Sequence, residues 1–404
     1  MGIDPILTHF WPAANVLLGC TSHRHLMAYR AVRHVGSGGE ANKKAHLPFE
    51  AGARLARHER CRCGLRVSAS VAARALQPGI VSNLEPSMER RQLGSTVFKV
   101  APFAFGGNVF GWTVDEPTSF RLLDAFVDAG FNLIDTADSY SRWVPGHQGG
   151  ESETIIGRWI AQRGHHEDVV IATKVGSDMG LGRKCLSRDY IVQAVEQSLR
   201  RLQVDAIDLY QSHWDDAQTP FEETLEAYGR LIRQGKVKAI GASNLDAERL
   251  TLALEVSRHP GFPRYETLQP LYNLYDRATF EGPLATVCAR EKIGVITYFS
   301  LAAGFLTGKY RTDTDFAKSP RGEGMKKYMN PRGRSILAAL DQAAENYHVT
   351  PAQVALAWLI ARPGVTAPIA SATSLAQLNE LIAATRLTLD TETTNTLDRA
   401  SAPG

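Results

Sequence analysis

The sequence predicts an α/β fold for residues 88–404, a (β/α)8 TIM barrel that begins with a short β-hairpin. Three observations carry this prediction. Short apolar runs alternate with amphipathic segments of helical period from Met88 onward. The apolar runs are almost uninterrupted, which is typical of parallel strands that helices cover. Eight strand–helix units can be counted, and this number favours a closed barrel over an open doubly wound sheet.

The elements are expected in the following order. Residues 88–107 form a hairpin that turns at Leu93–Ser95, and the first barrel strand follows from it. Pro117 begins the first long helix, and Gly130 ends it, because proline suits the first helical turn and glycine the position after the last. The expected strands cover residues 100–105, 131–135, 168–174, 207–213, 237–242, 267–271, 295–298 and 363–370. The expected helices begin near Asp115, Gly150, Ser187, Pro220, Asp246, Pro351 and Ser374.

A doubly wound dinucleotide-binding fold is the competing architecture. It would place the pattern G-x-G-x-x-G directly after the first strand. Residues 106–111 come near this glycine content, but the spacing is wrong and no well-placed acidic residue follows a second strand. The barrel is therefore preferred.

Composition sets broad limits on function. The chain has 404 residues, of which 44% are hydrophobic and 22% charged, and this excludes disorder throughout. The net charge of +3 is too small to indicate nucleic acid or an anionic membrane as a partner. No run approaches the roughly 18–20 apolar residues of a membrane span. Five cysteines do not resemble a disulfide framework, so a cytoplasmic enzyme is the expectation.

Residues 1–87 differ from the rest of the chain. They hold eleven Lys/Arg and five Asp/Glu, a charge of +6, and they show no sustained period and no clear caps. We expect a disordered extension, or upstream codons translated ahead of a functional start at Met88. A basic, acid-poor composition also partly matches an organellar transit peptide, although Asp4 does not. The cysteines Cys61 and Cys63 lack the usual zinc spacing.

Four ionisable residues stand at or after the ends of apolar strands. Asp135 ends the second strand, Lys174 the third and His213 the fourth, while Tyr140 follows five residues after Asp135. Active sites of such barrels form at the carboxyl ends of the strands, so these side chains can converge. Taken singly, Asp135 could be a loop carboxylate, Lys174 a solvated strand end and His213 a core histidine.

Together the four residues suit acid–base chemistry at a carbonyl. A phenol has an ordinary pKa near 10, and a neighbouring ammonium such as Lys174 would make Tyr140 more acidic. A paired Asp135 would keep Lys174 charged, and His213 would hydrogen-bond the carbonyl oxygen. None of these groups can deliver a hydride, so a nicotinamide is the economical carrier.

Several dispersed motifs resemble the aldo-keto reductase superfamily. They are FNLIDTADSY at 131–140, IATKV at 171–175, DLYQSH at 208–213, GASN at 241–244 and YFSLAAGFLTGKY at 298–310. The resemblance covers about Met88 to the C-terminus. It implies that Asp135, Tyr140, Lys174 and His213 form the family's catalytic tetrad, with Tyr140 as general acid in reduction and general base in oxidation.

The resemblance also implies an extended nicotinamide cofactor across the mouth of the barrel, NADP(H) by expectation, with NAD(H) as the alternative. Ser243, Asn244 and Gln269 would hold the carboxamide, and Tyr298 would stack on the ring. The pyrophosphate would follow Phe299, Ser300, Leu301, Gly304, Leu306 and Lys309, and the adenosine side Ser371, Thr373, Ser374, Gln377 and Glu380. Helix capping explains Ser374 nearly as well.

Two positions depart from the family pattern. Phe299-Ser300 follows Tyr298 where many relatives have Ser-Pro, so the local backbone is expected to differ. Ser374 stands where many relatives carry an arginine that contacts the 2′-phosphate of NADP. A hydroxyl brings no charge, so discrimination against NAD should be weaker.

Four aromatic residues in expected loops would line a substrate pocket: Trp112, Trp143, Trp214 and Tyr272. No arginine cluster accompanies them, which disfavours strongly anionic sugar phosphates. The segment from Arg311 to Arg334 is expected to be a mobile flap that cofactor orders, or an exposed loop.

The sequence therefore predicts an enzyme that interconverts small carbonyl compounds and alcohols, with no metal. One alternative is a cofactor-binding regulatory subunit, because some members of the superfamily modulate a membrane partner. Another is a metal-dependent barrel lyase or hydrolase, which would need converging histidines and carboxylates, whereas only His213 stands at a strand end among them. The physiological substrate and the oligomeric state are not indicated.

Overall fold

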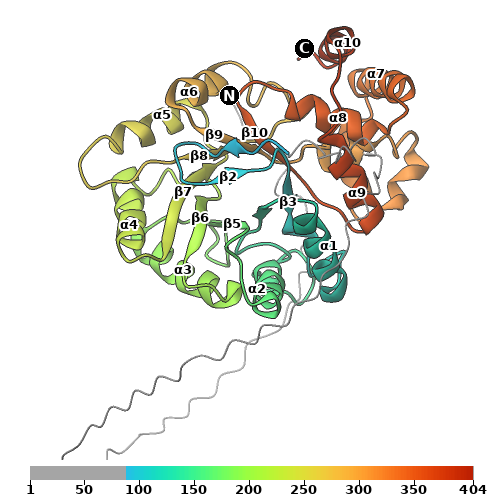
Figure 1. Ribbon diagram of the computed structural model, residues 1–404. Helices are drawn as coiled ribbons and strands as arrows, with labels where there is room; N and C mark the ends of the chain where they lie inside the picture. Colours follow the sequence, from blue (N-terminus) through green and yellow to red (C-terminus); the bar gives the residue numbers. More distant parts are fainter. Residues whose placement is uncertain (1–87, 404) are drawn as a thin grey trace, which may run out of the picture. The chain divides into compact units, whose positions relative to one another are not determined.

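The computed structural model describes residues 88–403, and the expectations for residues 1–87 lie outside it. Eight parallel strands form a closed barrel in the order β10-β3-β4-β5-β6-β7-β8-β9, which confirms the predicted fold class. Figure 1 shows this ring of strands inside a layer of helices. The strands are β3 (Ala104–Gly106), β4 (Leu133–Asp135), β5 (Val170–Val175), β6 (Ile207–Ser212), β7 (Val237–Ser243), β8 (Thr267–Gln269), β9 (Gly294–Thr297) and β10 (Val365–Ala370).

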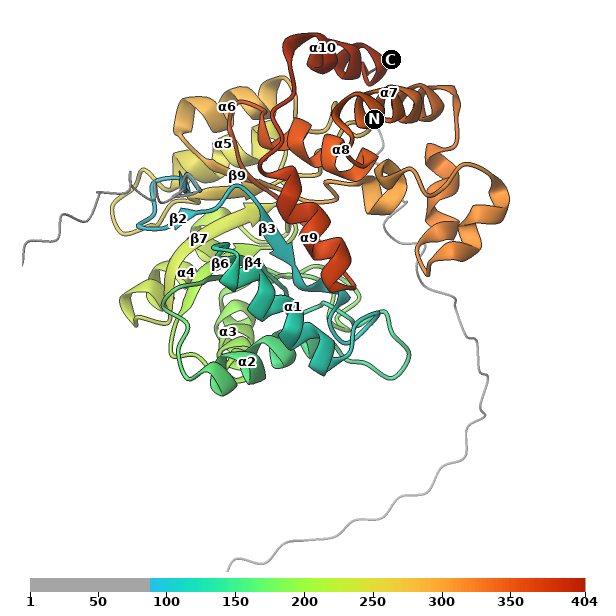
Figure 2. The ribbon, with the colours of Figure 1, turned by 45° about the vertical axis from the view of Figure 1, so that its right-hand side comes forward.

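Helices cover the outside of the barrel, as the turned view in Figure 2 shows. They are α1 (Glu116–Asp128), α2 (Glu151–Arg163), α3 (Arg188–Leu202), α4 (Phe221–Arg233), α5 (Ala247–Val256), α6 (Pro283–Glu291), α7 (Pro331–Tyr347), α8 (Pro351–Ile360), α9 (Leu375–Ala384) and α10 (Thr391–Ala400). Asp115, Asp246 and Ser374 accept hydrogen bonds from backbone N–H groups in the first turns of their helices, as expected of N-caps. Within residues 88–403, no helix is both long and apolar enough to cross a bilayer.

A two-stranded hairpin closes one end of the barrel. Its strands, β1 (Arg91–Gln92) and β2 (Lys99–Val100), are antiparallel and lie across the ring of strands in Figure 1. Gly94 in the turn packs so closely on the backbone of Glu266 and Gly294 that a Cβ atom would not fit. These two residues stand at the starts of β8 and β9, so the hairpin covers the amino ends of the strands. The carboxyl ends stay available for a site.

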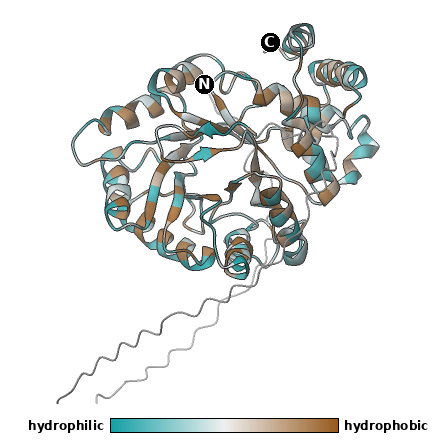
Figure 3. Ribbon diagram, in the orientation of Figure 1, coloured by the Kyte–Doolittle hydropathy of each residue, from teal (hydrophilic) through white to brown (hydrophobic). Residues whose placement is uncertain are grey.

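The core has two layers. Apolar side chains from the strands and the hairpin fill the interior of the barrel, and a larger set lies between strands and helices. Figure 3 shows the same division, with apolar residues on the strands and on the inner faces of the helices. The interior set is Leu93, Val100, Ala104, Leu133, Val170, Ala172, Leu209, Ala239, Ile296, Ala367 and Ile369. The barrel is therefore packed rather than open, and a ligand must bind at its mouth.

The start of the first barrel strand and the set of helices differ from the sequence prediction. The first barrel strand begins at Ala104 rather than Val100, because Val100 belongs to the hairpin. Helices α6, α7 and α10 were not among the expected helix starts. Helices α6 and α7 each begin with a proline in the first turn, and Asn330 also caps α7 by accepting from the N–H of Gly333.

The segment from Arg311 to Arg334 is not the structureless loop that its composition suggests. It contains two 3-10 helices, η4 (Asp313–Lys318) and η5 (Gly322–Tyr328), and its last residues belong to α7. Thr312 and Asp315 form a capping box at η4, and Phe316 and Tyr328 are buried. Local capping and two aromatic anchors thus hold the chain in place. Ordering of this segment by cofactor stays a prediction.

The contact between α2 and α3 allows a test of the packing. Gly157 in α2 lies so close to α3 that a Cβ atom would come within 2.0 Å of the carbonyl oxygen of Arg201. Gly157→Ala should therefore destabilise the protein by about 1–3 kcal/mol, because two helix backbones must separate. Thermal unfolding measures the effect, and Gln162→Ala on the exposed face of α2 is the control. Equal melting temperatures for both variants would contradict this close approach.

Candidate active site

The centre of the site is the ammonium group of Lys174 at the end of β5, which is 0% exposed. It donates all three of its N–H groups: to Asp135 Oδ2 at 2.7 Å, to the Thr136 carbonyl oxygen at 2.8 Å and to the Tyr140 hydroxyl at 2.8 Å. An ammonium has three donors. Lys174 therefore has none left for a ligand, and it can act on a substrate only through Tyr140.

The other partners complete this cluster. The Tyr140 hydroxyl donates to Asp135 Oδ2 at 3.0 Å, and the Gln269 amide donates to Asp135 Oδ1 at 2.8 Å. Residues from β4, β5 and β8 thus meet at one point because the carboxyl ends of parallel strands share one mouth. The predicted convergence of Asp135, Tyr140 and Lys174 is present in the structure.

The acidity of these groups differs in one respect from the sequence prediction. Burial raises the pKa of Tyr140 well above its usual range, and the Asp135 carboxylate adds to this shift. Burial also lowers the pKa of Lys174, although Asp135 opposes the change. Lys174 was expected to lower the pKa of Tyr140, but the net shift is upward, because burial and the Asp135 carboxylate outweigh the cation. A phenol with a raised pKa keeps its proton at neutral pH and is available as a proton donor.

His213 lies beside Tyr140, with their ring centroids 6.0 Å apart. Burial holds the pKa of His213 well below its usual range, and the nearby cation of Lys174 lowers it further. The ring is therefore neutral. Its Nδ1 atom lies 3.0 Å from the hydroxyl oxygen of Ser177. When that hydroxyl donates to Nδ1, the imidazole proton is on Nε2, and this N–H can donate a hydrogen bond to a substrate oxygen atom.

Three of the four predicted pocket aromatics gather around these groups. The rings of Trp112 and Trp143 are 5.5 Å apart, Trp143 is 6.2 Å from Tyr140, and Trp214 stacks on His213 at 5.8 Å. Tyr272 does not join them. Tyr272 is 2% exposed, and its ring packs on Phe280 and Trp358. Its hydroxyl donates a hydrogen bond to Glu281. The prediction that Tyr272 lines the substrate pocket is wrong, because this side chain packs in the core.

The residues expected to hold a nicotinamide form a connected group at the ends of β7, β8 and β9. Ser243 donates to the Gln269 carbonyl oxygen at 2.7 Å, and Asn244 donates to Ser243 at 3.1 Å. The Tyr298 hydroxyl donates to the Asn244 side-chain oxygen at 2.8 Å. Both N–H groups of the Asn244 amide are thereby used, since it also donates to the His213 carbonyl oxygen at 2.9 Å. An amide, a hydroxyl and an aromatic face beside the Tyr140 cluster are group types that suit a nicotinamide carboxamide and ring, which would have to replace some of these internal bonds.

The backbone after Tyr298 has an unusual course. Phe299 has φ of 53°, and Ala302, Ala303 and Gly304 also have positive φ. The proline of the Ser-Pro pattern corresponds to Ser300 rather than to Phe299, so the expectation of a different local backbone stays a prediction. The Lys309 ammonium lies about 3.4 Å from where a Cβ of Gly304 would stand, so a cation adjoins this strained turn. An anion such as a pyrophosphate fits these features.

The remaining residues expected near the cofactor are in mixed positions. Ser300 and Leu306 are buried. Ser371 donates to Asn108 at 2.6 Å, and Thr373 to Gln377 at 3.0 Å. Ser374 is the N-cap of α9, as the capping alternative predicted. Glu380 is hydrogen-bonded to Thr350 at the start of α8 and is not brought to the others.

Sequence reasoning missed one side chain at this mouth. Arg321, between η4 and η5, places its guanidinium carbon 5.0 Å from the centre of the Trp112 ring. Its position in a basic, glycine-rich stretch concealed it, because such composition indicates solvent exposure. The only available signal was the length of the segment, which is enough to reach back over the barrel.

The fold and these side chains define a (β/α)8 barrel with a Tyr-Lys-Asp cluster and a nicotinamide-compatible group at its mouth. Comparison with known families agrees, since residues 102–402 match the model of the Aldo/keto reductase family. The chain belongs to this family of oxidoreductases.

Several relatives are similar along most of their length. Aldo-keto reductase YhdN of Bacillus subtilis (strain 168) is 35% identical over 72% of this chain and 85% of its own. The uncharacterized oxidoreductase YrpG of the same organism is 36% identical over 76% of this chain and 93% of its own. A probable voltage-gated potassium channel subunit beta of Arabidopsis thaliana is 32% identical over 72% of this chain and 90% of its own.

A buried carboxyl beneath the site has its own consequence. Asp138 is 4% exposed and its Oδ1 atom has no hydrogen-bond partner among residues 88–403. Burial, together with the nearby Glu153, raises the pKa of Asp138 to about 8. Between its ordinary value and about 8, the unfolded chain gives up this proton while the folded protein keeps it. Folding stability therefore falls as pH rises through this window.

Asp138→Asn removes the ionisable group and should raise the melting temperature at about pH 9, by roughly 4 °C or more, with a smaller gain at about pH 5. Differential scanning calorimetry at both pH values measures the difference. Asp205→Asn changes the same charge at an exposed position and is the control. A gain that is the same at both pH values would contradict the raised pKa.

Proposed function

We propose that the protein is an NADP(H)-dependent oxidoreductase that reduces aldehyde or ketone carbonyls to alcohols, or catalyses the reverse reaction. The observation that carries this proposal is the Tyr140 hydroxyl, which lies 2.8 Å from the Lys174 ammonium and 3.0 Å from the Asp135 carboxylate at the mouth of the barrel. Residues 88–404 would form this enzyme as one barrel domain. The cytoplasm is the proposed compartment, with no membrane or nucleic-acid partner.

Tyr140 is the proposed proton donor to the carbonyl oxygen. Its hydroxyl now donates to Asp135, so it must turn from the carboxylate toward the substrate to transfer its proton. Lys174 then stabilises the phenolate that forms, and Asp135 keeps Lys174 charged. His213, as a neutral ring, donates its remaining N–H to the same carbonyl oxygen and orients it. The bound nicotinamide supplies the hydride in reduction and accepts it in oxidation.

Ser243, Asn244 and Gln269 are proposed to bind the carboxamide, and Tyr298 to pack on the ring. Lys309 and the turn at Gly304 would face the pyrophosphate. We propose NADP(H) as the cofactor and NAD(H) as the alternative. Ser374 brings no charge to the adenosine side, so the ratio of kcat/KM for NADPH and NADH should be smaller than in an enzyme with arginine there.

A cofactor-binding regulatory subunit is the second candidate. The similarity to a probable potassium channel subunit beta favours it. The geometry of the Tyr140 cluster supports the enzyme instead, because a protein that only senses cofactor has no need of a proton donor. Tight NADPH binding without turnover of a broad carbonyl panel would favour the regulatory role.

The first test removes the proton donor. Wild-type protein should oxidise NADPH with 4-nitrobenzaldehyde, and Tyr140→Phe should lower kcat by about two to four orders of magnitude, because general acid catalysis is lost. NADPH fluorescence titration should show unchanged cofactor binding. Tyr347→Phe, which removes a surface hydroxyl bonded to Asp390, is the control. Turnover retained by Tyr140→Phe would exclude this role.

The second test uses the raised pKa of Tyr140. Reduction needs the protonated phenol, which persists through neutral pH, so kcat for reduction should stay level between about pH 6 and pH 8. Oxidation needs the phenolate, so its kcat should rise with pH over the same range. Initial rates are compared, so that the pH dependence of the overall equilibrium does not enter. Reduction that declines from pH 6 while oxidation stays flat would argue for an acidified phenol.

A further inference from the structure

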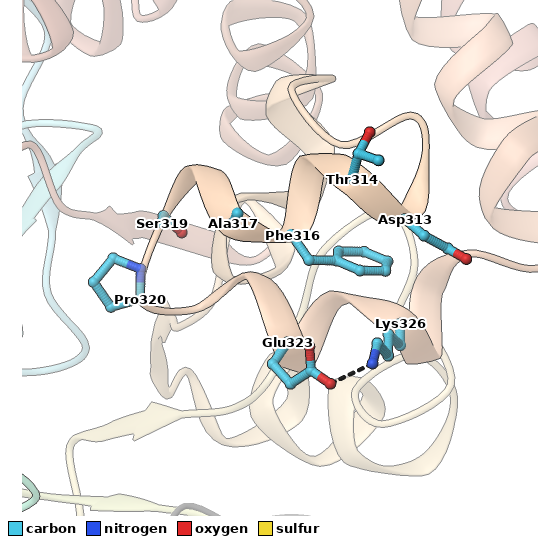
Figure 4. Close-up of a pocket in the computed structure, with 8 residues that line it drawn as sticks. All are labelled: Asp313, Thr314, Phe316, Ala317, Ser319, Pro320, Glu323 and Lys326. Atoms are coloured by element: carbon cyan, nitrogen blue, oxygen red, sulfur yellow. Dashed lines mark hydrogen bonds and ion pairs between the residues drawn. The ribbon is translucent and has the colours of Figure 1, made fainter.

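Arg321 is the unusual cation at the mouth of the barrel. Its Nη2 atom is buried and has no hydrogen-bond partner in the described part of the chain. Neighbouring cations do have carboxylate partners: Lys318 pairs with Asp315, and Lys326 pairs with Glu323. Figure 4 shows the second pair on the wall of a hollow between η4 and η5, which contains none of the proposed catalytic residues. Asp315 and Glu323 are therefore committed to other cations.

A backbone hydrogen bond and a cation–π contact position Arg321. Ser319 accepts a hydrogen bond from the backbone N–H of Arg321 at 3.3 Å and is also bonded to the Tyr310 hydroxyl at 2.5 Å. The guanidinium lies over the ring of Trp112, a cation–π contact that tolerates loss of water but satisfies no N–H group. A buried guanidinium N–H without an acceptor is costly. An incoming anion would remove that cost.

Arg321 also shares its surroundings with the proton donor. Trp112 touches Trp143, and Trp143 touches Tyr140. The positive charge of Arg321 acts on Tyr140 directly and lowers its pKa, in opposition to burial and Asp135. The guanidinium and the phenol thus adjoin the same pair of tryptophan rings, Trp112 and Trp143.

We propose that Arg321 is a substrate-binding residue that pairs with a carboxylate, so that the preferred substrates are carbonyl compounds that also carry a carboxylate group. This inference rests on the proposed reductase function and names its substrate class. A guanidinium binds a carboxylate through two parallel N–H···O bonds. The tryptophans would pack on the carbon skeleton between the carboxylate and the carbonyl carbon.

A single arginine in an aromatic setting favours a monoanion over a dianion. The sequence argument against sugar phosphates thus stands, because no further arginine among the described residues accompanies Arg321 at Trp112. A carboxylate could not be expected from the sequence, since Arg321 lies far along the chain from Trp112 and Trp143. Closure of the segment over the mouth is what adds the charge.

The experiment compares carboxybenzaldehyde with its methyl ester, two substrates that differ in one charge. Wild-type protein should prefer the acid. Arg321→Gln should lower kcat/KM for the acid by about tenfold to a hundredfold, mainly through KM, because a charge-assisted hydrogen-bonded pair is lost. For the ester the change should stay within about twofold. Arg321→Lys keeps the positive charge but cannot form two parallel hydrogen bonds, so its kcat/KM for the acid should lie between those of wild type and Arg321→Gln.

Lys326→Gln is the matched control, because it removes a cation of the same segment that already has a carboxylate partner. It should leave the preference for the acid unchanged. Equal losses on acid and ester in Arg321→Gln would overturn the proposal, and so would a weaker NADPH affinity that accounts for the whole effect. In the latter case the guanidinium would serve the cofactor phosphates.

Benzoate binding gives a readout that does not depend on turnover. Quenching of tryptophan fluorescence should report it in the NADPH-loaded protein, with the affinity reduced about tenfold or more in Arg321→Gln. If no carbonyl is turned over, the proposed reductase function fails, while benzoate binding that depends on Arg321 still supports the carboxylate site. Equal benzoate affinity in wild type and Arg321→Gln would overturn that site.

Discussion

The burial of the Lys174 ammonium is the constraint around which the mouth of the barrel is arranged. A charged group without water is tolerated only when its hydrogen-bonding capacity is filled. Asp135, Thr136 and Tyr140 fill it completely. Each of these acceptors follows from the end of β4, so the fold must bring β4 and β5 into register for the charge to be stable. The parallel pairing of Asp135 with Ala172 does this.

The same constraint determines what the site can do chemically. Lys174 has no free N–H, and its influence therefore passes through the phenol of Tyr140. Because burial and Asp135 raise the pKa of that phenol, Tyr140 keeps its proton in the absence of substrate. The neutral His213 and the tryptophan rings give the mouth an apolar part, and cations adjoin it: Lys174 beside Tyr140, Arg321 over Trp112 and Lys184 over Trp214. Such a mouth suits a substrate with a carbonyl at one end and an anion at the other.

Much of this arrangement could be predicted because its signals are local. Strand periodicity, helix caps and the polar residues at strand ends identify the barrel and the cluster of Asp135, Tyr140 and Lys174 without any knowledge of distances. The directions of other side chains could not be predicted, because the sequence holds no local signal for them. An aromatic residue after a strand can turn to the mouth, as Trp214 does, or into the helix layer, as Tyr272 does. Only the packing of Phe280 and Trp358 decides between these directions.

The sequence by itself determined the fold class, the order of the strands and the identities of the groups that meet at their carboxyl ends, because residue period and strand direction are properties of the chain. The tertiary structure alone decided the direction of the pKa shift of Tyr140 and the place of Arg321. Burial depends on every element that surrounds a group, and a guanidinium more than two hundred residues from Trp112 reaches it only after the chain has closed into a barrel.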